Sequence, residues 1–191
     1  RNHFFPLEER RSRSKDENYL LQWYFDFNQV DLFNSVSNSK IKALLDLNIV
    51  IKLRDLKEGQ EIQDEEIKYL FNDDILTEVE YFFARESLAE ITRDNDTNRR
   101  KETRKLLKEF KQLDFHPDEF RFIYDKVLEP APPKCENDYS DRKQLTEAIA
   151  NNIPFFITTD RNLKKACKII EEHFNITISL PSEFIIHFDQ I

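Results

Sequence analysis

The sequence predicts an α/β fold in which a small parallel β-sheet is flanked by helices. Residues 43–53 form a run rich in Leu, Ile and Val, which is typical of a strand buried on both faces under helices. Apolar runs of the same kind predict strands at 153–160 and 176–180. Helical patterns lie between these runs, and strands that alternate with helices are typical of a parallel α/β sheet.

Composition sets limits on size and function. The chain has 191 residues, of which 39% are hydrophobic and 17 are Phe, enough for one domain with an appendage. The net charge of −8 argues against non-specific binding of nucleic acid by the whole surface. The single glycine, Gly59, argues against glycine-rich phosphate-binding loops. Two distant cysteines and the lack of a bilayer-spanning apolar run predict a cytoplasmic protein with no membrane partner.

Two regions are expected. Residues 1–40 form an N-terminal arm with an aromatic segment at 19–33, which we assign as helical although its pattern also fits a strand. Residues 41–191 form the main α/β domain. Its helices are expected at 64–72, 85–93, 98–113, 141–150, 163–174 and, briefly, after 181.

Several stretches of the main domain fit more than one secondary structure or are irregular, and one predicted helix has a candidate capping residue. Residues 75–83 fit a strand or the start of a helix, and residues 120–127 fit a helix or a short strand. The proline-bearing stretch 129–137 is expected to be irregular. Ser140 is expected to cap the helix at 141–150, which would place Asp141 in its first turn.

Four acidic residues stand at element ends or on inward helix faces: Asp46, Glu90, Asp141 and Asp160. An ionised Asp46 inside its apolar run would be costly, unless the strand ends near Leu45 and delivers it to the edge where open α/β sheets bind ligands. Asp160 ends a second strand in the same way. Clustered carboxylates imply a cation, and Mg²⁺ and Mn²⁺ prefer such oxygen ligands. The predicted chemistry is phosphodiester hydrolysis.

Each acid taken singly has a plainer explanation. Asp141 fits a charge that favours a helix N-terminus, Asp160 fits a cap of the following helix, and Glu90 fits a surface acid. Asp46 is the hardest to explain in this way because its neighbours are apolar. We favour the shared acidic site because costly ionisable groups cluster at functional sites.

Four segments together resemble the PIN-domain nuclease family: LLDLNIV at 44–50, SLAEI at 87–91, SDRKQLTEAIA at 140–150 and FFITTDRNL at 155–163. The resemblance spans residues 41–187. It implies a small parallel sheet between helices and a Mg²⁺- or Mn²⁺-dependent ribonuclease, a family that includes the toxins of toxin–antitoxin pairs. It further implies that Asp46, Glu90, Asp141 and Asp160 are the metal-binding, catalytic set.

The resemblance also assigns supporting roles and leaves gaps. Asn48 would support Asp46, and Thr158 or Thr159 would hydrogen-bond near the site. Glu86 lies on the same helical face as Glu90 and could take its place. The arm at 1–40 exceeds the compact family core, and residues 112–139 match none of its motifs.

Three functions stay open. The first is a metal-dependent nuclease that cleaves RNA. A basic helix face would contact the nucleic-acid backbone, and it consists of Arg99, Arg100, Arg104, Lys105 and Lys108. A solvated helix surface explains these charges equally well. The second is a silent or partner-inhibited module that binds RNA or protein; the protein partners considered are an antitoxin-like inhibitor, another protein or a second copy in a homodimer. The third, a phosphatase-like fold with Asp46 as nucleophile, ranks last because Asn48 stands where that chemistry needs a second Asp.

Overall fold

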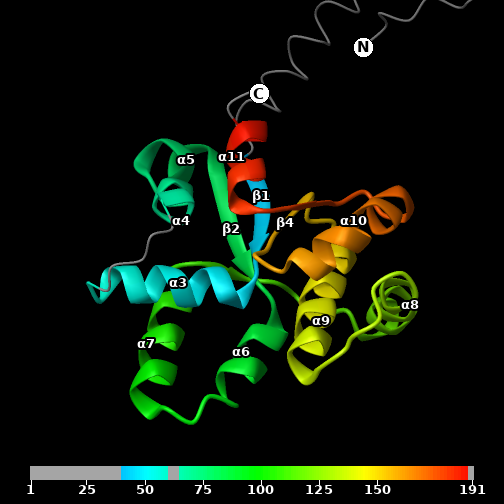
Figure 1. Ribbon diagram of the computed structural model, residues 1–191, viewed down its shortest axis with the longest axis horizontal. Coiled ribbons are helices and arrows are strands. Elements are labelled where there is room, and N and C mark those ends of the chain that lie inside the picture. Colours follow the sequence, from blue (N-terminus) through cyan, green and yellow to red (C-terminus); the bar gives the residue numbers. More distant parts are fainter. Residues whose placement is uncertain (1–39, 60–64, 189–191) are drawn as a thin grey trace, which may run out of the picture. The chain divides into compact units, whose positions relative to one another are not determined.

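A five-stranded parallel β-sheet forms the centre of the domain in this computed structural model (Figure 1), which describes residues 40–59 and 65–188. All four neighbouring strand pairs are parallel. The strand order is β3-β2-β1-β4-β5. The strands are β1 (Ile41–Leu45), β2 (Val79–Phe83), β3 (Lys111–Gln112), β4 (Phe155–Ile157) and β5 (Thr177–Ser179). The predicted α/β architecture, a small parallel sheet flanked by helices, is confirmed.

The chain order creates a switch point at the middle of the sheet. From β1 the chain adds β2 and β3 on one side, and it then returns to add β4 and β5 on the other. Ala43 is opposite Phe155 and Leu45 is opposite Ile157, so β1 and β4 end side by side. Open α/β sheets bind ligands outside the carboxyl ends of the strands at such a point.

Helices cover both faces of the sheet (Figure 1). Because strand side chains alternate between faces, Ala43 and Leu45 pack into one core and Leu44 packs into the other. The first core lies under α3 (Leu47–Lys57), α4 (Glu65–Leu70), α5 (Asp73–Glu78), α6 (Arg85–Ile91), α7 (Thr97–Leu107) and α11 (Pro181–Phe188). The second lies under α8 (Pro117–Leu128), α9 (Glu136–Ala150) and α10 (Arg161–His173).

The first apolar run is split between a strand and a helix. A strand was expected over 43–53, but the strand ends at Leu45 and α3 begins at Leu47. Asp46 makes the change, because it has extended backbone angles and its side chain accepts a hydrogen bond from the Asn48 amide. The apolar residues after it are buried as one side of a helix.

Other boundaries differ for similar reasons. Residues 75–83, left open between helix and strand, contain the end of α5 and all of β2. The helix predicted at 98–113 runs over Thr97–Leu107, because Asp96 caps it through the amides of Asn98 and Arg99. Residues 120–127 lie inside α8, which starts at Pro117, a favoured first helical residue.

The start of α9 was predicted wrongly. The helix begins at Glu136 rather than Asp141, so Ser140 does not cap it and Asp141 lies in its second turn. The carboxylate of Asp138 accepts hydrogen bonds from the Lys134 amide and the Cys135 thiol, which fixes the earlier start. The irregular proline-bearing stretch therefore ends at Cys135.

Apart from Lys40, the described residues belong to a compact unit that comprises 41–191. The predicted arm at 1–40, with its aromatic segment, falls outside the described residues apart from Lys40. None of the helices in the described ranges has the length and apolar character needed to cross a membrane.

Candidate active site

Asp46 is delivered by the end of β1 into a fully buried position. Its Oδ2 accepts a hydrogen bond of 2.6 Å from the hydroxyl of Thr158, and its Oδ1 accepts one of 3.4 Å from the amide of Asn48. Burial raises the pKa of Asp46, these hydrogen bonds lower it, and the charge of Asp160 raises it again. The carboxylate is thus held in place while its charge is only partly compensated.

Thr158 joins the ends of the two central strands. Its hydroxyl oxygen accepts a hydrogen bond of 3.0 Å from the amide of Asp160 while it donates to Asp46. Asp160 caps α10, because its Oδ1 accepts a hydrogen bond of 2.7 Å from the Asn162 amide. Thr159 instead lines a separate cavity beside Lys52. Thr158 is therefore the threonine that contacts the acidic set.

Asp141 is buried but has no hydrogen-bond donor of its own. It is 5% exposed, and its carboxylate accepts no hydrogen bond from residues 40–59 or 65–188. The nearest cation is Arg142, whose Nη1 lies 3.9 Å from Asp141 Oδ2. The pKa of Asp141 is raised to about 8, first by burial and then by the charges of the other three acids, while Arg142 lowers it. A buried carboxylate with one long ion pair and no hydrogen bond is costly.

Glu90 completes the set from α6. Its Oε2 accepts a hydrogen bond of 3.0 Å from the side chain of Gln144. Burial, followed by the charge of Asp46, raises the pKa of Glu90 to about 7. Glu86, one turn earlier, is instead engaged by Arg93 and Ser140 at the edge of the site. The structure therefore brings Glu90, rather than Glu86, into the same electrostatic cluster as Asp46.

Gln144 of α9 supports the site in a way that sequence reasoning missed. Its Oε1 accepts hydrogen bonds from the Leu47 amide at 3.3 Å and from the Ser87 hydroxyl at 3.0 Å. Together with the bond to Glu90, these contacts tie α9 to the starts of α3 and α6. The sequence did contain a signal for this role. Residues 136–150 are mostly polar, yet they lead into the apolar strand β4, so some of these polar side chains had to be buried.

Arg142, the residue after Asp141, is the second missed group. Its side chain is only 3% exposed, and its Nη1 donates a hydrogen bond of 3.1 Å to Asp160 Oδ2. Its Nε donates to the carbonyl of Ala131 at 3.1 Å, which anchors the guanidinium to the loop before α9. The acidic set therefore contains a fixed positive charge.

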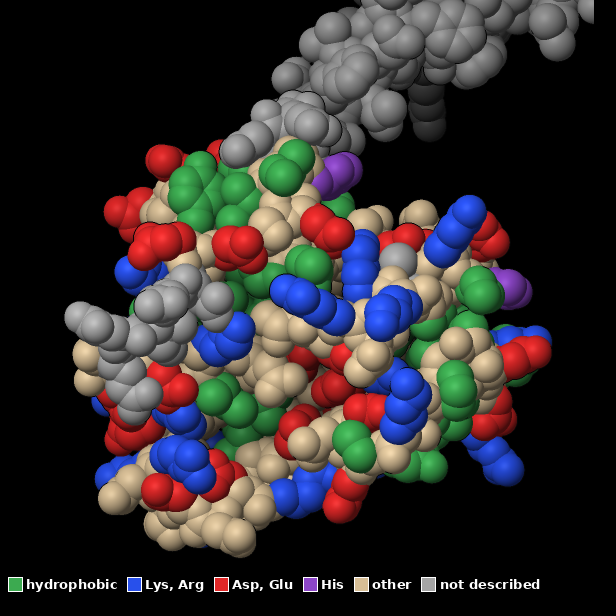
Figure 2. Space-filling model, viewed as in Figure 1, with side chains coloured by type: hydrophobic (Ala, Val, Ile, Leu, Met, Phe, Trp, Pro, Cys, Tyr) green, Lys and Arg blue, Asp and Glu red, His purple; other side chains and the backbone are tan. Residues whose placement is uncertain are grey.

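Figure 2 shows Asp and Glu atoms near the middle of one face with Lys and Arg side chains around them, whereas Asp46 itself is fully buried. The carboxylate oxygens of Asp46, Glu90 and Asp141 are of the kind that Mg²⁺ and Mn²⁺ prefer, and Asp141 is only weakly compensated, by Arg142 at 3.9 Å. Within the described ranges, no group of three or more His, Cys, Asp or Glu side chains is already arranged to hold a metal ion. The donors thus fit in chemistry and charge, and metal binding would require them to adjust.

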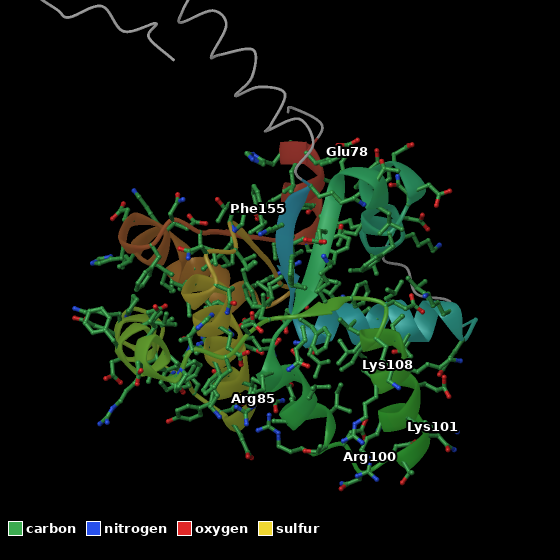
Figure 3. All side chains as sticks on the ribbon, turned by 180° about the vertical axis from the view of Figure 1, so that it is seen from behind. Glu78, Arg85, Arg100, Lys101, Lys108 and Phe155 are labelled. Atoms are coloured by element: carbon green, nitrogen blue, oxygen red, sulfur yellow. The ribbon has the colours of Figure 1, made fainter. Side chains whose placement is uncertain are left out.

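The five basic residues predicted as a nucleic-acid contact are spread over several faces of α7. Figure 3 shows Arg100 and Lys108 toward opposite ends of this helix. Arg99 is paired with Asp94 at 3.1 Å, and Lys105 lies 3.9 Å from Glu102. Among the five, Arg100 lines a cavity of about 290 Å³ that also includes Glu90 and Arg93. Two positively charged side chains, Arg93 and Arg100, therefore line the same cavity as Glu90 of the acidic set.

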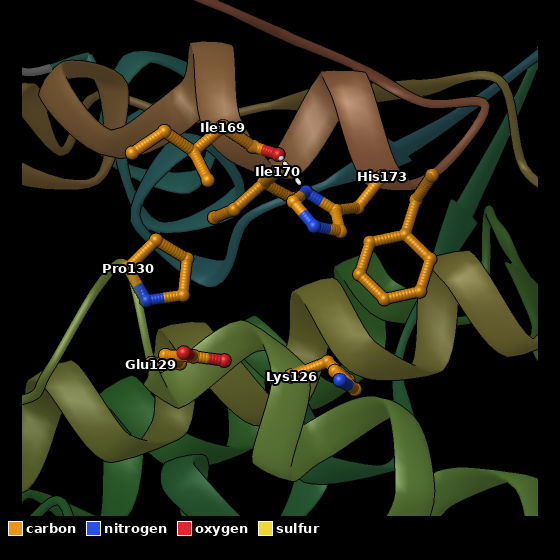
Figure 4. Close-up of a pocket in the computed structure, with 7 residues that line it drawn as sticks. Lys126, Glu129, Pro130, Ile169, Ile170 and His173 are labelled. Carbon is orange, nitrogen blue, oxygen red and sulfur yellow. Dashed lines mark hydrogen bonds between the residues drawn. The ribbon is translucent and has the colours of Figure 1, made fainter.

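A third cavity, of about 220 Å³, lies between the end of α8 and α10 (Figure 4). Ile169, Ile170 and His173 line its α10 side. His173 turns back on its own helix, where Nδ1 lies 2.7 Å from the carbonyl oxygen of Ile169. This cavity shares no residue with the acidic set, so it is separate from the candidate site.

Comparisons with known proteins find structural matches alone. No protein-family model matches the chain, and no curated protein matches its sequence. VapBC2 from Rickettsia felis, bound to a DNA fragment from their promoter, is 16% identical, with a TM-score of 0.48 over 73% of this chain and 98% of the other. FitAcB from Neisseria gonorrhoeae is 13% identical, with a TM-score of 0.45 over 73% and 97%.

Proposed function

We propose that this chain is a divalent-metal-dependent nuclease that hydrolyses RNA phosphodiester bonds. The observation that carries the proposal is the buried carboxylate of Asp141, which accepts no hydrogen bond from the described residues. Burial and the charges of three other acids raise its pKa, and its one described cation partner, Arg142, lies 3.9 Å away. Such a group is stabilised by a cation bound close to it. RNA is proposed over DNA because of the family resemblance of the sequence.

In this proposal Asp46, Glu90 and Asp141 hold Mg²⁺ or Mn²⁺. The bound ion would supply an activated water molecule and stabilise charge on the phosphate. The chain's own residues orient the ligands, since Thr158 fixes one oxygen of Asp46 and Gln144 fixes one oxygen of Glu90. Asp160 lies in the same cluster but is paired with Arg142.

The cavity beside Glu90 is the proposed approach for the substrate. Arg93 and Arg100 line it and carry donors suited to phosphate oxygens. The side chain of Arg93 is shared with Glu86, whereas the side chain of Arg100 hydrogen-bonds only to Thr97 within the described ranges. A nucleic-acid backbone that reached Glu90 through this cavity would therefore pass Arg100.

A cleavage assay tests the proposal. The full chain is incubated with single-stranded RNA, structured RNA and DNA in Mn²⁺, Mg²⁺ or EDTA, beside Asp46→Asn and the exposed α8 control Asp125→Asn. We expect metal-dependent RNA cleavage that falls by more than about a hundredfold in Asp46→Asn, because loss of groups that merely orient metal ligands costs about 10–100-fold. The control should cleave like the wild type. Cleavage that persists in EDTA or in Asp46→Asn would reject the proposal.

A second function is favoured by one observation. Arg142 already offsets part of the acidic charge, and no described group of donors is arranged for a metal. A module that binds RNA or a protein inhibitor without cleaving is therefore the alternative. It predicts RNA binding that is unaffected by Asp46→Asn, and no cleavage in Mn²⁺.

A further inference from the structure

A cavity of about 330 Å³ lies at the edge of the sheet where β4 and β5 end. Thr159 lines it two residues after the last residue of β4, and Leu180 lines it directly after β5. The other lining residues come from α3, α4 and the starts of α10 and α11 (Figure 1). Open α/β sheets bind their ligands at this edge, and the volume is within the range of small-ligand sites.

The cavity adjoins the acidic set but contains none of its four residues. Thr159 lies between Thr158 and Asp160 in the chain, and the Asp160 amide donates a hydrogen bond of 3.0 Å to the Thr158 hydroxyl. The same hydroxyl donates to Asp46. A ligand in contact with Thr159 is therefore one residue away from two members of the site. The cavity is thus placed to hold the part of a substrate that lies beside the reacting bond.

The polar side chains that line the cavity are of two kinds. Lys52 and Arg161 are cations, whereas Glu66 and Thr159 offer a carboxylate and a hydroxyl. The side chains of Arg161, Glu66 and Thr159 make no hydrogen bond or ion pair with residues 40–59 or 65–188. These three groups can therefore bind a ligand that combines an anion with hydroxyl groups.

We propose that this cavity binds one nucleotide of an RNA chain beside the bond to be cleaved, and that it selects ribose over deoxyribose. Lys52 and Arg161 bind the phosphate, because ammonium and guanidinium groups suit phosphate oxygens. Glu66 and Thr159 bind the sugar hydroxyls. An ionised carboxylate only accepts hydrogen bonds, and the 2′-hydroxyl of ribose supplies a donor that deoxyribose lacks.

The carboxylate of Glu66 makes the cavity better suited to a ribonucleotide than to a bare phosphate. It repels any anion, and with the two cations it leaves a single net positive charge on the lining. A hydrogen bond from a sugar hydroxyl offsets that repulsion only where the hydroxyl is present. This assignment rests on the proposed function, which it deepens by naming the sugar as the feature that distinguishes RNA from DNA.

Binding in EDTA tests the sugar preference without cleavage. The full chain is titrated against fluorescein-labelled oligouridine and oligodeoxyuridine, which differ only at the 2′ position, and fluorescence anisotropy gives the affinities. We expect the RNA to bind about fivefold more tightly, since one hydrogen bond shifts an equilibrium by about two- to tenfold. Glu66→Ala should bring the two affinities within about twofold of each other, and Thr159→Val should reduce the preference. Glu65→Ala removes the same charge from the preceding residue, which pairs with Lys68 at 2.8 Å, and should keep it.

The salt dependence of binding tests the cations. Arg161→Gln should weaken both oligomers equally and lower the logarithmic salt slope by about 0.7, because one phosphate contact is lost. Lys168→Gln, on an exposed position of the same helix, should leave the slope unchanged. Uridine monophosphate is added as a competitor, and it should displace the RNA only at concentrations far above the oligomer's own dissociation constant.

Equal wild-type affinities for the two oligomers, an unchanged preference in Glu66→Ala, or an unchanged slope in Arg161→Gln would overturn the inference. Displacement by the free nucleotide as readily as by RNA would also overturn it, because the cavity would then bind a mononucleotide. The cleavage assay is independent of these readings. A sugar preference without cleavage in Mn²⁺ would reject the nuclease and keep this site, whereas metal-dependent RNA cleavage without the preference would do the reverse.

Discussion

The two polar helices near the site, α7 and α9, place their polar side chains in opposite surroundings. Along α7 the charged residues are exposed or half-exposed, and they pair with neighbours on the surface. Along α9, Asp141, Arg142, Gln144 and Glu147 are all buried. A polar side chain in water contributes little to stability, while a buried one must find a specific partner. The α9 residues should therefore be the sensitive ones.

The largest effect is expected at Gln144. Replacement by Ala removes three hydrogen bonds and leaves the Leu47 amide and the Ser87 hydroxyl without their partner. We expect the free energy of unfolding to fall by about 3 kcal/mol, because each buried group left unpaired costs about 1–3 kcal/mol. Urea unfolding measures this, with Lys101→Ala on α7 as the control. Equal effects at the two positions would contradict the contrast between the helices.

The pH dependence of stability should come from two buried acids of the site, Asp141 on α9 and Glu90 on α6. The pKa of Asp141 is raised from 3.8 to about 8 and that of Glu90 from 4.5 to about 7. The folded state then binds more protons than the unfolded state between these values, so stability is highest at low pH and falls as pH rises from about 4 to 8. Thermal unfolding in EDTA should show this fall, by about 2 kcal/mol or more.

Two controls sharpen that measurement. Asp141→Asn cannot titrate and should flatten the pH profile, and Mn²⁺ should do the same in the wild type by compensating the ionised acids. A wild-type profile that rises between pH 4 and 8 in EDTA would show that other groups dominate.

A smaller effect is expected at Glu147, the last of the buried charges on α9. Its two oxygens accept hydrogen bonds from the amides of Arg85 and Glu86, at 2.6 and 3.0 Å, and so cap α6 from another helix. Glu147→Gln keeps one acceptor and should cost about 1–2 kcal/mol, because charged acceptors form the stronger bonds. Chemical denaturation checks this beside the exposed Glu119→Gln on α8.

The smallest effect on stability is expected on α7. Arg104→Gln and Lys108→Gln should each change the free energy of unfolding by less than about 0.5 kcal/mol. If this helix contacts RNA, each change should still reduce the salt dependence of binding, with the logarithmic slope falling by about 0.7 per charge removed. Binding is measured in an Asp46→Asn background to prevent cleavage. An unchanged slope would assign these charges to a solvated surface.

The sequence carried enough information to predict the α/β fold and three of the five described strands. Apolar runs marked β1, β4 and β5, and the Asp that followed a run marked the switch point. The run at 43–53 misled because apolar residues suit a buried helix as well as a buried strand, and the cap at Asp46 decided between them. The two-residue strand β3 is too short and too exposed to have a pattern.

The residues that hold the acidic side chains in place were harder to predict than the acidic residues themselves. Arg142 and Gln144 look like ordinary surface residues of a helix, and their importance depends on partners such as Asp160 and Leu47, far away in the sequence. The wrong start of α9 had the same origin. Ser140 looked like a cap, whereas the side-chain bonds of Asp138 to the preceding turn set the true beginning.

The hydroxyl of Thr158 connects the ends of β1 and β4 through two hydrogen bonds that point the same way. A hydroxyl has one hydrogen, and here it points to Asp46 while its oxygen receives the amide hydrogen of Asp160. Hydrogen bonds aligned in this way polarise one another, so the Asp160 amide strengthens the hydrogen bond that Thr158 donates to Asp46. Oδ2 of Asp46 is thereby kept as a hydrogen-bond acceptor. A serine could preserve this ordering, whereas a valine of the same shape would erase it.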